Sequence, residues 1–113
     1  MDALAIAVGS SHAMTDRSAV LDHELIARPR AAVPVPLVLH RSSGVSDGEL
    51  QLAIAAGIAK VNVGTALNMA MTTAIRRSLA VQDSVDPRHY LTPARQVMAE
   101  TAEALLRVTR STP

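Results

Sequence analysis

The sequence predicts an α/β fold, because short apolar runs alternate with helical patterns along the chain. Three such runs, at residues 3–9, 35–40 and 58–63, have the length of strands. The first is nearly unbroken and shows no polar alternation, which predicts burial of both its faces, as in a parallel sheet. A stretch with apolar residues at helical spacing follows each of the three runs. Strand–helix alternation of this kind predicts a parallel sheet with right-handed crossover connections.

The length and composition exclude several classes of protein. A chain of 113 residues forms one domain at most. With no Phe or Trp and a single Tyr, it lacks the aromatic side chains that stack on nucleic acid bases. Its net charge of +1, without a block of like charge, does not favour a membrane surface or a polyanion as partner. The absence of Cys excludes disulfides and thiolate metal sites.

The apolar run at the start of the sequence is too short to span a bilayer and lacks the basic lead of a signal peptide. The expected location is therefore the cytoplasm. The expected partners include neither nucleic acid nor a membrane.

Start and stop signals place the first two helices. The first helical pattern covers residues 20–27, and Pro29 is expected to end it. Ser46 and Glu49 have the spacing of a capping box, in which Ser46 caps the helix and the Glu49 side chain reaches back to it. Gly57 is expected to end this second helix.

Two further helices are expected in the second half of the chain. One opens at Gly64-Thr65 and runs to about residue 80. Residues 83–90 are then expected to form a loop. The last helix is predicted to begin at Thr92-Pro93, where a cap and a first-turn proline stand in their favoured places.

Polar side chains follow the predicted strands at the points where the strands end. His12, His40 and Asn62 all fall there, and ligands of parallel sheets bind at the carboxyl ends of the strands. Imidazole is a good zinc ligand. The alternative is a pair of loop histidines without a metal, because their spacing matches no local metal motif. His23 and His89 are expected to be surface residues.

Two turns have the composition of phosphate-binding loops. Ser42-Ser43-Gly44 leads into one predicted helix, and Asn62-Val63-Gly64-Thr65 leads into the next. Backbone N–H groups and hydroxyls at helix starts bind phosphate with help from the helix dipole. The alternative is that both are ordinary caps and turns. Asn62, in an otherwise apolar run, is either a satisfied core group or a substrate contact.

Four motifs in order give the sequence a family resemblance. They are Val8-Gly9-Ser10-Ser11-His12, Leu39-His40-Arg41-Ser42-Ser43-Gly44-Val45, Lys60-Val61-Asn62-Val63-Gly64-Thr65 and Asp86-Pro87-Arg88-His89-Tyr90-Leu91-Thr92-Pro93-Ala94-Arg95. With them the chain resembles the class II, zinc-dependent fructose-bisphosphate/tagatose-bisphosphate aldolases. The resemblance implies that residues 1–113 form the carboxyl-terminal part of that family's barrel. That part is the last three βα units of a TIM (β/α)8 barrel plus a C-terminal helix, an incomplete barrel.

The resemblance also implies an activity. It is reversible aldol cleavage of a ketose bisphosphate to dihydroxyacetone phosphate and an aldehyde, with Zn²⁺ as the Lewis acid. By position, His12 and His40 would be zinc ligands, and a monovalent cation is a second candidate ion. The residues that would hold dihydroxyacetone phosphate are Ala13, Arg41, Ser42, Ser43, Asn62, Val63, Gly64 and Thr65.

The sequence departs from the family in two respects. Arg41 stands where the family usually has glycine, and its side chain either blocks the site or pairs with phosphate. The third zinc ligand and the aspartate proton donor lie on early strands in the family and have no counterpart here, so no catalytic residue is assigned.

Because an incomplete barrel leaves sheet edges open, the chain is expected to need the missing N-terminal half or a homo-oligomer. Alone, it is expected to be poorly soluble, oligomeric or partly unfolded. The competing hypotheses are a non-catalytic relic that binds sugar phosphates and a small α/β interaction domain.

Overall fold

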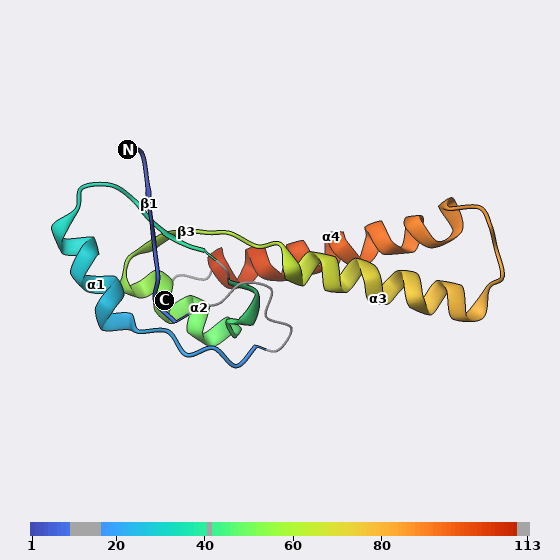
Figure 1. Ribbon diagram of the computed structural model, residues 1–113, viewed down its shortest axis with the longest axis horizontal. Helices are drawn as coiled ribbons and strands as arrows, with labels where there is room; N and C mark the ends of the chain where they lie inside the picture. The colour runs from blue at the N-terminus through green and yellow to red at the C-terminus, as the bar shows by residue number, and fades with distance from the viewer. Residues whose placement is uncertain (10–16, 41, 111–113) are drawn as a thin grey trace.

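The computed structural model describes residues 1–9, 17–40 and 42–110, and it confirms the predicted α/β class with a small parallel sheet and four α-helices (Figure 1). The elements, in chain order, are β1 (Leu4–Ile6), α1 (His23–Ala32), β2 (Leu37–Leu39), the 3₁₀ turn η1 (Ser42–Gly44), α2 (Asp47–Ala56), β3 (Ile58–Val61), α3 (Thr65–Val81) and α4 (Arg88–Arg110).

The strands form a sheet in the order β1-β2-β3, and both neighbouring pairs are parallel. Leu39, at the end of β2, pairs with Ile6 on one side and Val61 on the other. The three predicted strands are therefore present but shorter than expected. Their parallel pairing brings their carboxyl ends to one edge of the sheet.

The core lies between the sheet and the helices that cover one of its faces. Leu37 and Leu39 of β2 are fully buried. They belong to the same core cluster as Ile26 of α1 and Leu50 of α2. The prediction that both faces of the first strand are buried is wrong, because Ala5 is exposed. Alternate residues of a strand face opposite sides, and the core covers only the side of Leu4 and Ile6.

The prediction that Pro29 ends the first helix is also wrong. The helix starts three residues later than the predicted pattern, after Asp22, whose side chain accepts a hydrogen bond from Leu25 N, and it continues through Pro29 to Ala32. Its last turn carries Arg30, whose side chain packs over Gly57 at the end of α2. Tertiary packing of this kind outweighs the intrinsic cost of one proline in a helix.

The last helix begins earlier than predicted. Residues 88–90, expected to be loop, form the first turn of α4, and Pro93 lies inside the helix. The Asp86 side chain accepts a hydrogen bond from Arg88 N, and Leu91 N donates to the Pro87 carbonyl. Asp86-Pro87 and Thr92-Pro93 carry the same start signal, and the chain uses the first of them.

Helices α3 and α4 pack side by side as a hairpin that extends away from the sheet and gives the molecule its elongated form (Figure 1). The principal extents are 56 × 29 × 21 Å. Apolar side chains are exposed along this hairpin and its connection, at Leu79, Val81, Val85 and Leu91. Among the described helices, none combines the length and the apolar character that crossing a membrane would need.

Replacing Gly57 by Ala is expected to destabilise the protein by about 1–3 kcal/mol. Gly57 has φ +127°, and a Cβ there would lie 2.6 Å from Arg30 Cγ and 3.1 Å from Arg30 Cβ. Gly48→Ala is the matched control, since no atom lies within 4 Å of its Cβ position and the residue is helical. That variant should be neutral or more stable by about 0.4–1 kcal/mol. Urea unfolding of both variants tests the difference, and equal stabilities would contradict it.

Candidate functional site

The carboxyl edge of the sheet carries the predicted site residues that the structure describes. His40 follows β2 directly and is exposed, while Asn62 follows β3 and is half-buried. Asn62 N donates to the Leu39 carbonyl at 3.0 Å, so the chain after β3 stays beside the end of β2. His12, Ala13 and Arg41 lie outside the described residues.

A direct hydrogen bond joins the two predicted phosphate loops. The turn η1 contains Ser42, whose side chain is buried and whose hydroxyl donates to the Asn62 carbonyl at 2.5 Å. Within the turn, Val45 N donates to the Ser42 carbonyl at 2.9 Å. The Ser42 hydroxyl was predicted to contact substrate, but it donates its hydrogen bond to the neighbouring loop. Its role in this geometry is to fix the distance between the loops.

Replacing Ser42 by Ala is expected to destabilise the protein by about 1–3 kcal/mol, because it deprives the Asn62 carbonyl of its buried donor. Ser43→Ala, in the same turn but half-buried, is the matched control and should change stability by no more than about 0.5 kcal/mol. The free energy of unfolding in urea measures both. A Ser42 variant as stable as the Ser43 variant would show that the bond does not hold the loops.

The second loop opens directly into a long helix. Gly64 is the N-cap of α3 and makes no side-chain cap, while its carbonyl accepts from Leu67 N and Asn68 N. Among the described residues, no atom outside its chain neighbours and the helix backbone lies within 4 Å of a Cβ built on Gly64. Thr65, the first helical residue, is half-buried. The positive end of the α3 dipole thus lies at the end of the second predicted phosphate loop.

A cleft of about 350 Å³ lies between the first loop and α4. Ser42, Ser43 and Val63 line it from the sheet side, so the structure brings these three predicted residues together. Val97, Thr101 and Leu105 are among the α4 residues on the opposite wall. His40, Asn62, Gly64 and Thr65 do not line this cleft. The predicted site residues therefore occupy the sheet edge and one wall of the adjoining cleft.

Sequence reasoning did not identify Arg17 as a candidate residue. Its Nε donates to the Val45 carbonyl at 2.8 Å, and its Nη2 lies 2.5 Å from Asp47 Oδ1. It also lines the cleft. No local pattern could have identified it, because its partners lie 28 and 30 positions away in the sequence.

The predicted capping box is only half confirmed. Ser46 Oγ accepts from Glu49 N at 3.3 Å, as expected of an N-cap. The Glu49 carboxylate, however, does not turn back to Ser46 and instead accepts from Leu21 N at 3.1 Å. His23 Nε2 lies 2.9 Å from the same oxygen, and its Nδ1 is buried without a partner among the described residues. His23 is thus a half-buried link between α1 and α2, not the surface residue that was predicted.

The described residues supply one of the predicted zinc ligands, His40. In this part of the chain no three His, Cys, Asp or Glu side chains lie close enough together to hold a metal ion. An exposed imidazole at a strand end has the donor chemistry that zinc requires. The described residues therefore offer one possible zinc ligand at this edge, and zinc binding there stays a prediction.

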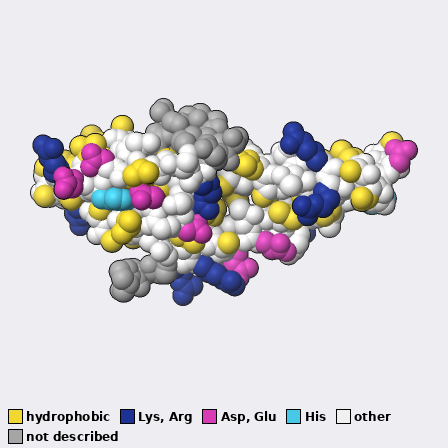
Figure 2. All heavy atoms as spheres, turned by 90° about the horizontal axis from the view of Figure 1, so that it is seen from below, with side chains coloured by type: hydrophobic (Ala, Val, Ile, Leu, Met, Phe, Trp, Pro, Cys, Tyr) yellow, Lys and Arg dark blue, Asp and Glu magenta, His cyan; other side chains and the backbone are white. Residues whose placement is uncertain are grey.

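Charged side chains do not form a single-sign surface on the face shown in Figure 2. Lys and Arg alternate there with Asp and Glu over the described residues. This distribution lacks the continuous basic stripe that binds a nucleic acid backbone.

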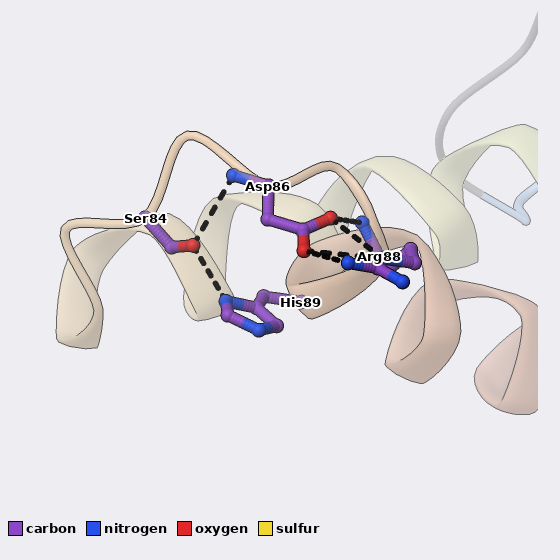
Figure 3. Close-up of polar contacts among 4 residues, drawn as sticks. All are labelled: Ser84, Asp86, Arg88 and His89. Carbon is purple, nitrogen blue, oxygen red and sulfur yellow. Dashed lines mark hydrogen bonds and ion pairs between the residues drawn. The ribbon is translucent and has the colours of Figure 1, made fainter.

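The fourth motif forms a small polar cluster at the start of α4 (Figure 3). The Asp86 carboxylate accepts from Arg88 Nε at 3.0 Å and lies 2.6 Å from its Nη2. The hydrogen bond from the Arg88 side chain lowers the pKa of Asp86. Ser84 Oγ lies 2.5 Å from His89 Nδ1 and accepts from Asp86 N. His89 is exposed, as predicted. This arrangement explains how the hairpin connection ends and α4 begins.

Comparisons with known proteins agree on one relationship. The family model described as fructose-bisphosphate aldolase class-II matches residues 1–113. The crystal structure of the YdjI aldolase from Escherichia coli K12 is 34% identical with a TM-score of 0.81, and the match covers 97% of this chain and 39% of that one. A putative fructose-1,6-biphosphate aldolase from Coccidioides immitis is 27% identical with a TM-score of 0.83, and the match covers 96% of this chain and 38% of that one. The chain therefore spans about two fifths of these solved structures.

Proposed function

The chain belongs to the class II fructose-bisphosphate aldolase family, and on this premise we propose that it acts as the carboxyl-terminal part of a zinc-dependent aldolase barrel. The completed (β/α)8 barrel would catalyse reversible aldol cleavage of a ketose bisphosphate to dihydroxyacetone phosphate and an aldehyde. The observation that carries the proposal is the Ser42–Asn62 hydrogen bond, which joins both predicted phosphate loops beside β2, the strand that His40 directly follows.

The predicted site residues divide into two groups with different tasks. His12 and His40 would hold zinc, together with a third ligand from the rest of the barrel. The turn η1 and the Asn62–Thr65 loop would hold the phosphate of dihydroxyacetone phosphate through hydroxyls, backbone N–H groups and the α3 dipole. Zinc, when bound, acts as a Lewis acid on the ketone oxygen.

Binding the phosphate at this edge would fix the position of the substrate relative to His40. Cleavage breaks the carbon–carbon bond between the dihydroxyacetone phosphate half and the aldehyde half of the ketose. In this proposal the two phosphate loops hold the first half, and no residue of this chain is assigned as the acid for the second. The proton donor is therefore expected from the same part of the barrel as the third zinc ligand.

Co-expression with the front half of a class II aldolase barrel tests the proposal. We expect a soluble complex that binds zinc and cleaves a ketose bisphosphate, whereas neither half does so alone. The same complex carrying Asn62→Ala is the control for the site, and it should lose most of the activity while assembling normally. A soluble, zinc-loaded complex without cleavage of fructose or tagatose bisphosphate would contradict the proposal.

A second candidate function is sugar-phosphate binding without turnover. It is favoured because the two phosphate loops lie within this chain and are joined by a hydrogen bond, whereas the described residues hold a single predicted zinc ligand. This function predicts that the chain alone binds dihydroxyacetone phosphate, more weakly in the Asn62→Ala variant. Cleavage by the reconstituted complex would favour the aldolase over this candidate.

A further inference from the structure

Arg17 makes contact with both sides of the junction between η1 and α2. Its Nε donates to the carbonyl of Val45, the residue that follows the turn and is fully buried in the core. Its Nη2 binds the carboxylate of Asp47, the first residue of α2, at 2.5 Å. One guanidinium thus spans the link between the predicted phosphate turn and the helix that follows it.

The backbone next to Arg17 adds a second contact to the same turn. Ala19 N donates to the Gly44 carbonyl at 2.9 Å, and Ala19 forms an isolated parallel bridge with Val45. On the opposite side, Ser42 is bonded to Asn62. The turn is therefore held from two directions, by the loop after β3 and by residues 17–19.

We propose that Arg17 is a positioning residue for the phosphate turn, which it holds in the conformation that binds the anion. The inference rests on the proposed function, because it assigns to Arg17 the preorganisation of the same phosphate site. Preorganised donors bind more tightly because no conformational freedom is lost on binding.

The charges that line the cleft indicate whether Arg17 positions the phosphate turn or contacts the anion directly. Asp47 and Glu100 line the cleft together with Arg17, so two carboxylates face one guanidinium there. From the described lining residues, an anion in the middle of this cleft would meet net negative charge. Arg17 therefore acts through the carbonyl of Val45 and the start of α2, and the anion is bound by the turn itself.

The exposure of the Arg17–Asp47 ion pair distinguishes a positioning role of Arg17 from stabilisation of the whole fold. The side chains of Arg17 and Asp47 are 43% and 54% exposed, so solvent screens their attraction. Loss of the pair should therefore have little effect on global unfolding. Loss of the Arg17 contacts should still loosen the turn and weaken anion binding.

The test compares Arg17→Ala with Arg107→Ala, which breaks a more exposed ion pair, the one with Glu103 on α4. The full chain is titrated with inorganic phosphate and with dihydroxyacetone phosphate, and the amide shifts of Ser43 and Gly44 are followed by NMR. We expect about tenfold weaker binding for Arg17→Ala, the equivalent of one lost hydrogen bond. Arg107→Ala should bind like the wild type and melt within a few degrees of it. Arg17→Ala also deprives the Val45 carbonyl of its donor, so its melting temperature should fall by no more than that of Ser42→Ala.

Two further measurements make the inference specific. Arg17→Lys retains the charge but lacks the forked guanidinium that donates to both the Val45 carbonyl and Asp47, so it should recover only part of the affinity for the anion. In the reconstituted aldolase, Arg17→Ala should raise KM for the ketose bisphosphate with little change in kcat.

The outcomes separate the inference from the proposed function. Wild-type binding in the Arg17→Ala variant overturns the positioning role and leaves the function intact. A drop in melting temperature larger than that of Ser42→Ala also overturns it, because Arg17 would then stabilise the whole fold. No binding of either anion by the wild type, in the chain or in the complex, overturns both.

Discussion

Replacing His40 by Ala in the reconstituted barrel is expected to weaken zinc binding by more than about 100-fold, since loss of an outer partner of a ligand already costs up to that much. His40 is the first residue after the central strand, and its exposed ring stands at the carboxyl edge of the sheet. Cleavage of the ketose bisphosphate should fall with the bound metal. Competition against a chelator of known affinity measures the zinc, and a coupled assay measures the cleavage.

His89→Ala is the matched control, because that ring lies in the polar cluster at the start of α4. It should leave both zinc affinity and cleavage unchanged. Equal zinc affinities in the His40 and His89 variants would remove His40 from the metal site. Such a result would favour the sugar-phosphate-binding function, in which the strand-end histidine has no metal to bind.

Replacing Leu39 by Ala is expected to destabilise the chain by about 2–5 kcal/mol. Leu39 is fully buried in the central strand and pairs with Ile6 and Val61 in the two neighbouring strands. Its removal opens a cavity where the core is shared by all three strands. Because small domains are stable by only about 5–15 kcal/mol, this loss should remove a large share of the free energy of unfolding.

Leu79→Ala controls for the loss of the same side chain on the surface. Leu79 lies on α3 in the hairpin and is 50% exposed, so its replacement should change stability by less than about 0.5 kcal/mol. Urea unfolding curves of the two variants give the comparison. A Leu39 variant that loses less than the Leu79 variant would place the core elsewhere.

The sequence by itself determined the α/β class and the order of the elements. The apolar runs located the three strands, and the local cap and stop signals at Ser46 and Gly57 placed α2 correctly. The start of α3 was also correct. These features depend on residues within one turn or one strand of each other, where periodicity and capping leave a readable pattern. The four motifs identified the family for the same reason, because each is contiguous.

Only the tertiary structure decided which of several local signals the chain uses. Pro29 is a signal for the end of a helix, yet α1 continues past it because Arg30 packs over the end of α2. The chain carries two proline-containing start signals, Asp86-Pro87 and Thr92-Pro93, and α4 begins at the earlier one. Glu49 has the spacing of a capping box, but its carboxylate binds His23 and Leu21 N.

The site shows the same division. Its residues were readable as motifs, whereas the contacts that arrange them join positions distant in the sequence. Ser42 and Asn62 are 20 positions apart, and Arg17 and Asp47 are 30 apart. Such pairs leave no periodic trace, because the folded sheet and the helices packed on it bring them together. The sequence therefore determined which chemistry the chain carries, and the packing of the three strands decided which side chains hold it in place.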